Sequence, residues 1–170
     1  MPVPGRAAVA QLVRAPLSAT SAGLLVHRRG GRGIEVLLVH PGGPYWARRD
    51  AGAWSIPKGE VDDGEDPLGA AQREFREELG LAPPSGPFVE LGTVRQKAGK
   101  TVHAWAVEGD LDVAAIAGAT IEIEWPPRSG QRRSFPEIDR AAWCTPDEAR
   151  RLLIEAQVAF IERLAAALAR

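Results

Sequence analysis

The sequence predicts an α/β protein in which a mixed β-sheet lies between helices. Two apolar runs, 18–28 and 34–40, are continuous rather than alternating, which is typical of strands buried on both faces. Helical patterns follow at 67–79 and at 146–169. A sheet that is buried on both faces needs helices on both sides, so these observations together predict three layers, α/β/α.

Length and composition indicate one globular domain. The chain has 170 residues, of which 45% are hydrophobic and 25% are charged. We expect a single domain over 18–170, preceded by a loose tail at 1–17 that is interrupted by prolines. The net charge of −1 argues against bulk affinity for nucleic acid or for an anionic membrane, so any attraction for phosphate has to be local.

Cysteine content and hydropathy bear on the compartment. Cys144 is the only cysteine, so no intramolecular disulfide can form, and a reducing cytoplasm is the expected location. Its place in an apolar strand pattern predicts a packed small side chain rather than a nucleophile. No apolar run approaches the roughly 18 residues that would suggest a membrane span.

The first two strands should form a hairpin, because the Gly-rich segment 29–33 connects them. The following segment, 41–53, is a loop by composition. It carries Tyr45 and Trp46 beside two arginines, a combination that can stack a base and hold phosphate. An aromatic anchor that only fixes the loop is an equal alternative.

A second hairpin is expected from strands at 88–95 and 101–108. Lys100 lies at its turn and is a candidate substrate contact, although solvated turn lysines are common. Alternation places His103, Trp105 and Val107 on one face, so His103 is either a packing residue or a further substrate contact.

The last third of the chain predicts a short strand at 120–125, a basic loop at 126–133 that could close on an anionic substrate, and one long helix at 146–169. Ile154, Val158 and Ile161 project away from the main apolar face of that helix. They could serve a second layer or a dimer contact, so both a monomer and a homodimer are compatible with the sequence.

The segment 67–79 carries the chemistry. Asp66 can cap it, Pro67 suits the first helical position, and Gly80 can end it. Glu74, Glu77 and Glu78 then fall within about 100° of arc, beside a separate apolar stripe. Like charges at this spacing repel, so the face either binds a cation or is a solvated surface balanced by neighbouring arginines. Clustered carboxylates suit Mg²⁺ or Mn²⁺.

The spacing around this helix resembles the Nudix box: Gly59, five residues, Glu65, seven residues, and then the run REFREELGL over 73–81. The resemblance to Nudix hydrolases implies a Nudix fold and cleavage of a nucleoside diphosphate that is linked to another group. It implies that the Gly59 carbonyl and the carboxylates of Glu74, Glu77 and Glu78 hold divalent metal. It also implies that Arg73 orients these glutamates and that Glu65 braces the loop.

The general base is either Glu74 or a carboxylate outside the box. In the latter case the resemblance favours Glu137, just before the last core strand, and then Glu124.

The run WSIPKGE at 54–60 resembles the lead-in of Nudix enzymes that act on diadenosine and diphosphoinositol polyphosphates, which makes Lys58 a candidate phosphate contact. The expected substrate is a nucleoside triphosphate or a dinucleoside polyphosphate. The alternatives are an ADP-ribose-like nucleotide sugar and a sensor domain that binds nucleotide without cleaving it.

Overall fold

The computed structural model describes residues 19–170. The predicted tail at 1–17 lies outside these residues. The main sheet has the order β4-β5-β1-β2-β8, and β3 pairs with β1 beside this path. β1 and β5 run parallel, whereas the other neighbours are antiparallel, so the sheet is mixed as predicted. The strands are β1 (Thr20–Gly30), β2 (Gly33–Pro41), β3 (Lys58–Glu60), β4 (Phe88–Arg95), β5 (Thr101–Glu108) and β8 (Ile138–Cys144).

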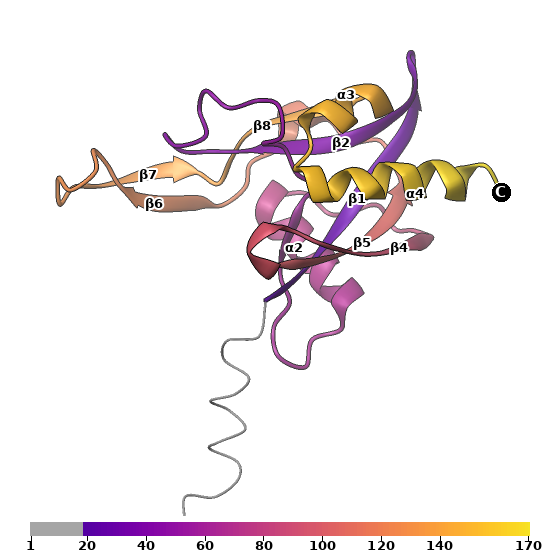
Figure 1. Cartoon of the computed structure of the whole chain (residues 1–170), viewed down its shortest axis with the longest axis horizontal. Coiled ribbons are helices and arrows are strands. Elements are labelled where there is room, and N and C mark those ends of the chain that lie inside the picture. The colour runs from indigo at the N-terminus through magenta and orange to yellow at the C-terminus, as the bar shows by residue number, and fades with distance from the viewer. Residues whose placement is uncertain (1–18) are drawn as a thin grey trace, which may run out of the picture.

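Helices cover both faces of the sheet (Figure 1). Helix α2 (Pro67–Leu79) packs on one face through Phe75 and Leu79. Helices α3 (Pro146–Leu152) and α4 (Val158–Leu168) cover the other face, where Phe160 is fully buried. The predicted α/β/α arrangement is confirmed.

The bounds of α2 follow from local chemistry, as predicted. The Asp66 carboxylate accepts a hydrogen bond from the Gly69 backbone N–H at 3.0 Å, and Pro67 begins the helix. Gly80 ends it with a left-handed φ of 68°. A Cβ at this position would lie 2.1 Å from the Ala117 carbonyl oxygen, so only glycine fits there.

The expectation of one long C-terminal helix is wrong. The segment is divided into α3 and α4, with an extended Leu153 and a short 3₁₀ turn (Glu155–Gln157) between them. Trp54 causes the break by pairing with this segment: its N–H donates to the Leu152 carbonyl at 2.9 Å, and its carbonyl accepts from the Ile154 N–H at 2.8 Å. Backbone groups that pair with Trp54 in this way are not available to a continuous helix.

Gln157 completes the break. Its fully buried amide oxygen accepts from the Ile56 N–H at 3.0 Å, and its amide nitrogen donates to Ser55 Oγ and to Gln96 Oε1. Ile161, which we expected to project from the main apolar face, is buried in the same core as Phe160. It therefore does not provide the external contact surface that the sequence suggested.

The basic loop expected at 126–133 is shorter than predicted. Arg132 and Arg133 belong to strand β7 (Arg132–Pro136), which pairs with β6 (Thr120–Glu124) in a separate two-stranded sheet. This hairpin projects from the body of the molecule (Figure 1). Short connections at 113–115 and 97–99 are 3₁₀ turns.

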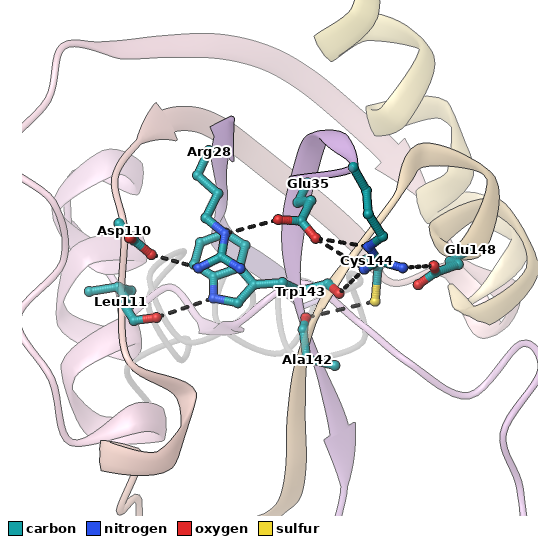
Figure 2. A network of polar contacts seen from close by, with 9 residues as sticks. Arg28, Glu35, Asp110, Leu111, Ala142, Trp143, Cys144 and Glu148 are labelled. Atoms are coloured by element: carbon teal, nitrogen blue, oxygen red, sulfur yellow. Dashed lines mark hydrogen bonds and ion pairs between the residues drawn. The ribbon is translucent and has the colours of Figure 1, made fainter. Parts of the chain in front are cut away.

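A polar network ties the sheet together at the end where β1 meets β2. Arg28 donates to Glu35 at 3.1 Å and to Asp110 at 2.7 Å, and it lies 4.1 Å from the centroid of the Trp143 ring (Figure 2). The Trp143 indole donates to the Leu111 carbonyl at 3.1 Å. These contacts join three strands to the connection after β5.

Cys144 is buried near this network, and burial raises the pKa of its thiol to about 11. This confirms the predicted packing role, because a thiol of that pKa stays protonated at neutral pH. Over residues 19–170, no helix combines the length and the apolar character that crossing a membrane would require.

Gln157→Ala should destabilise the protein by about 1–3 kcal/mol, because it leaves the buried Ile56 N–H and the Gln96 amide without their partner. Urea unfolding of the two proteins measures the difference. Gln131→Ala, at an exposed position, is the matched control and should stay within about 0.5 kcal/mol of wild type. Equal stability of the two variants would contradict this account of the helix break.

Candidate active site

The Gly59 backbone lies directly against Glu74. Strand β3 pairs Gly59 with Ala22 of β1, which brings the chain over the middle of helix α2. A Cβ built on Gly59 would be 2.0 Å from the Glu74 carboxyl carbon, so no larger residue fits without displacing that carboxylate. The sheet pairing and the helix together fix the Gly59 carbonyl close to the acidic face.

Arg73 gathers the acidic side chains around one guanidinium. It donates two hydrogen bonds to Glu65, at 2.8 and 2.9 Å, and single bonds to Glu74 at 2.9 Å and Glu77 at 3.1 Å. It also donates to the Glu60 carbonyl at 3.0 Å. The bonds from Arg73 are the main cause that lowers the pKa of Glu65 to about 2, so this carboxylate stays ionised.

Glu78 has a different environment. It accepts a hydrogen bond from the Lys58 backbone N–H at 2.8 Å, but burial dominates and raises its pKa to about 8, with further contributions from Glu137 and Glu74. Burial also raises the pKa of Glu74. A buried carboxylate beside other carboxylates favours a bound cation, because a cation would offset both effects.

A cleft of about 250 Å³ opens beside these groups. The Lys58, Glu78 and Glu137 side chains line it together with the Trp46 ring and apolar residues from β2 and β8. Burial, followed by repulsion from Lys100, lowers the pKa of the Lys58 ammonium. The cleft thus combines carboxylates, a cation and an exposed aromatic ring at one place.

The family model described as the NUDIX domain matches residues 17–165, which is most of the chain. The chain belongs to the Nudix hydrolase family. The fold and the carboxylate arrangement described above are therefore those of a Nudix protein.

Among curated relatives, an RNA pyrophosphohydrolase from Francisella tularensis subsp. mediasiatica is 47% identical over 49 residues, 28% of this chain and 32% of that protein. An RNA pyrophosphohydrolase from Vibrio cholerae is 30% identical over 120 residues, 65% of this chain and 67% of that protein. The match to the first of these spans only about a third of the relative.

Solved structures share the fold. The C. elegans Ap4A hydrolase in a binary complex aligns with a TM-score of 0.63 and 24% identity, covering 88% of this chain and 98% of that chain. The NUDIX domain of Shewanella oneidensis NrtR, complexed with ADP ribose, aligns with a TM-score of 0.59 and 16% identity, covering 89% of this chain and 88% of that chain.

The donor set at the Nudix box fits a divalent metal in its chemistry. Glu74, Glu77 and Glu78 offer hard carboxylate oxygens, and the Gly59 backbone lies against Glu74. Across residues 19–170, however, no three acidic, histidine or cysteine side chains are gathered as a complete coordination sphere. Arg73 holds Glu74 and Glu77 in ion pairs, so a metal would compete with this guanidinium for them.

The other predicted site residues divide into two groups. Trp46, Lys58 and Glu137 lie together at the cleft, and Lys100 is close enough to influence the pKa of Lys58. His103 is not among the residues that line the cleft. It stacks on Trp105 with a centroid distance of 4.0 Å and hydrogen-bonds Glu90 at 2.7 Å.

Tyr45 and Glu124 also lie outside the cleft lining. The Tyr45 ring contacts Trp125 of the projecting hairpin, with 5.6 Å between the ring centroids. The Glu124 carboxylate accepts from the Gly130 N–H at 3.1 Å, within the turn that joins β6 to β7. Glu137, rather than Glu124, is therefore the carboxylate outside the box that reaches the cleft.

Sequence reasoning missed His40, which supports one wall of the cleft. Its fully buried ring contacts Asp139 Oδ1 at 2.7 Å through Nδ1 and the Arg49 carbonyl at 2.5 Å through Nε2. Each ring nitrogen therefore faces an oxygen atom. The only signal in the sequence is one histidine at the end of an apolar run, which packing alone can explain.

The pKa of Glu78 predicts a pH-dependent gain in stability for Glu78→Gln in metal-free protein. The pKa of this carboxyl is near 4.5 in the unfolded chain and about 8 in the folded one. Its contribution to the free energy of unfolding is therefore fully present below about pH 4.5 and is lost as the pH rises through 8. Glutamine does not ionise. We therefore expect a higher Tm for the variant at about pH 9 than for wild type, with little difference at about pH 5.

Thermal unfolding with a chelator present measures this difference, and about 1 kcal/mol corresponds to about 2–4 °C in a chain of this size. Glu77→Gln is the matched control, because the Glu77 side chain is 57% exposed on the same helix. A Tm change for Glu78→Gln that is the same at both pH values would show that burial of the charge is not its cause.

Proposed function

We propose that this chain hydrolyses a diphosphate linkage in a nucleoside polyphosphate, with Mg²⁺ or Mn²⁺ held by Glu74, Glu77, Glu78 and the Gly59 carbonyl. One observation carries the proposal. The largely buried Glu78 carboxylate of the Nudix box meets Lys58, Glu137 and Trp46 at a single cleft. Anionic phosphates need the cations, and a base can stack on the indole.

The metal would neutralise phosphate oxygens and lower the pKa of the attacking water. The residues of the chain supply the remaining functions. Lys58 binds a phosphate oxygen, and its lowered pKa reflects a partly desolvated ammonium beside Glu78. Arg73 positions Glu74 and Glu77 through its two ion pairs.

Glu137 is the better placed of the two candidate bases. Glu74 is half-buried beneath Gly59 and is already hydrogen-bonded to Arg73. Glu137 is exposed at the edge of the cleft, and the backbone on either side of it is fixed by bonds to Ala119 and Gly42. We assign proton transfer from water to Glu137 on this basis.

A second candidate substrate is the 5′-triphosphate end of an RNA. It is favoured by the relatives named RNA pyrophosphohydrolase, to which parts of this chain are 30–47% identical. Such an end presents the same phosphoanhydride as a free nucleoside triphosphate. An ADP-ribose-like nucleotide sugar and nucleotide sensing without hydrolysis are the remaining alternatives, and the same assay separates them.

We also infer that residues 18–170 act as one domain in the cytoplasm. The two apolar clusters lie on opposite faces of the same sheet, and the single thiol is buried, which suits a reducing compartment.

The first experiment incubates the protein, with Mg²⁺ and with Mn²⁺, with nucleoside triphosphates, diadenosine polyphosphates, ADP-ribose and a 5′-triphosphorylated oligonucleotide, and identifies the hydrolysis products by chromatography. Glu78→Gln and Glu137→Gln should each lower kcat by about 100-fold or more, because one removes a metal ligand and the other the base. Glu90→Gln, an exposed carboxylate outside the cleft, is the control. Tight binding without any turnover would instead favour a sensor.

Trp46→Ala should raise KM about tenfold for every nucleotide that is cleaved, because stacking of a base on an aromatic ring contributes about 1–3 kcal/mol. Trp46 is 39% exposed, so its loss should change Tm little. Steady-state kinetics with the matched variant Trp46→Phe, which keeps a stacking surface, test the assignment. An unchanged KM for Trp46→Ala would mean that this ring only fixes the loop.

A further inference from the structure

The two faces of the β6–β7 hairpin differ in chemistry. Cross-strand partners share a face, and Ile123 pairs with Arg133 while Glu124 pairs with Arg132. Alternation along β6 adds Trp125 to the face of Ile123. One face therefore carries apolar groups, an indole and Arg133, whereas the other face carries both acidic residues of the hairpin, Glu122 and Glu124, with Arg132.

The face with Trp125 is directed toward the wall of the cleft. The Tyr45 ring meets the Trp125 ring edge to face at 5.6 Å, and a Cβ at Gly43 would be 3.0 Å from Ile123 Cδ1. Tyr45 is followed directly by Trp46, whose ring lines the cleft. Of these two adjacent aromatic residues, Tyr45 thus contacts the hairpin and Trp46 lines the cleft.

Cations collect along the same path. Arg48 and Arg49 follow Trp46, and Arg128 and Arg133 lie on the hairpin and its turn. Within residues 19–170 none of these four arginines forms an ion pair, whereas Arg73 is paired with several carboxylates. A protein of net charge −1 therefore carries, on this loop and hairpin, four arginines that have no ion-pair partner among the described residues.

We propose that this face of the hairpin, formed by Tyr45, Trp125 and Arg133, is a second binding subsite that takes the second nucleotide unit of the substrate, next to the unit bound in the cleft. The inference rests on the proposed function and specifies its substrate as one with two nucleotide units. A base stacks on the exposed part of Tyr45, which is 56% exposed, or of Trp125. Arg133 binds the phosphate attached to it.

Two sources supply such a second unit: the far nucleoside of a dinucleoside polyphosphate and the next nucleotide of a 5′-triphosphorylated oligonucleotide. Both carry a second aromatic base and its phosphate: in the dinucleoside polyphosphate they lie across the cleaved bond from the first nucleoside, and in the oligonucleotide they follow the first nucleoside. A nucleoside triphosphate has no second unit, so it should occupy the cleft without reaching the hairpin.

The experiment compares KM and kcat for ATP, diadenosine tetraphosphate and a short 5′-triphosphorylated oligonucleotide, using wild type and Arg133→Ala. For Arg133→Ala relative to wild type, we expect KM to rise about tenfold for the two-unit substrate that the protein uses. KM for ATP should change less than twofold, and kcat should be unchanged. The substrate that shows the rise identifies the source of the second unit. Raising the salt concentration should reduce the difference between wild type and variant, because the lost contact is ionic.

Arg132→Ala is the matched control, since it removes the same charge from the neighbouring position on the opposite face. It should leave all three KM values within twofold of wild type. Equal effects of the two variants, or an equal rise of KM for ATP, would overturn the subsite. Trp125→Phe, which keeps a stacking surface, and Trp125→Ala, checked by Tm, then test the aromatic component.

Failure of the subsite and failure of the proposed function give different results. If wild type hydrolyses none of the three compounds, the proposed function is wrong, and equilibrium titration with the same compounds replaces the kinetics. A loss of affinity confined to Arg133→Ala and to the two-unit compounds then supports the subsite. Equal affinity of both arginine variants for every compound refutes it.

Discussion

The arrangement of the site depends on one guanidinium among many carboxylates. Glu65, Glu74 and Glu77 all converge on Arg73, which also binds the Glu60 carbonyl. Without this cation the three acids would repel one another across the start of the helix and the loop before it. Because Arg73 bonds to both the loop and the helix, it also fixes the approach of β3 to β1, and Glu78 then meets the Lys58 N–H.

Two hollows of the described structure show why charge, rather than size, identifies the candidate cleft. The larger one, about 440 Å³, lies beside Arg28 and Asp110, which are already paired with each other; Figure 2 shows these two residues. The smaller cleft, about 250 Å³, holds a buried Glu78 whose pKa is strongly raised. A ligand cation or phosphate gains little at the first and offsets an existing cost at the second.

The sequence predicted those elements whose causes are local. Asp66 and Gly80 bound helix α2 through contacts within a few residues, and the box spacing identified the acidic face before any coordinates. The break after Leu152 was missed because it depends on Trp54 and on the bond from Ile56 to Gln157, which are 101 residues apart. Residues 146–169 are rich in helix-favouring residues, so no local signal in the sequence opposed a continuous helix. His40 was missed for the same reason, since its side-chain partner Asp139 is 99 residues away, in β8.

Backbone hydrogen bonds and an aromatic contact connect the wall of the cleft, the candidate base Glu137 and the projecting hairpin. Glu137 lies between two backbone bonds, from its own N–H to the Ala119 carbonyl and from the Gly42 N–H to its carbonyl, each 2.9 Å long. His40 fixes the other end of the same loop through the Arg49 carbonyl. A group bound on Tyr45 or Trp125 therefore contacts the loop that carries Trp46 and the hairpin that leads into Glu137. Under the proposed function, recognition of the second nucleotide unit and placement of the base Glu137 are linked through these backbone bonds.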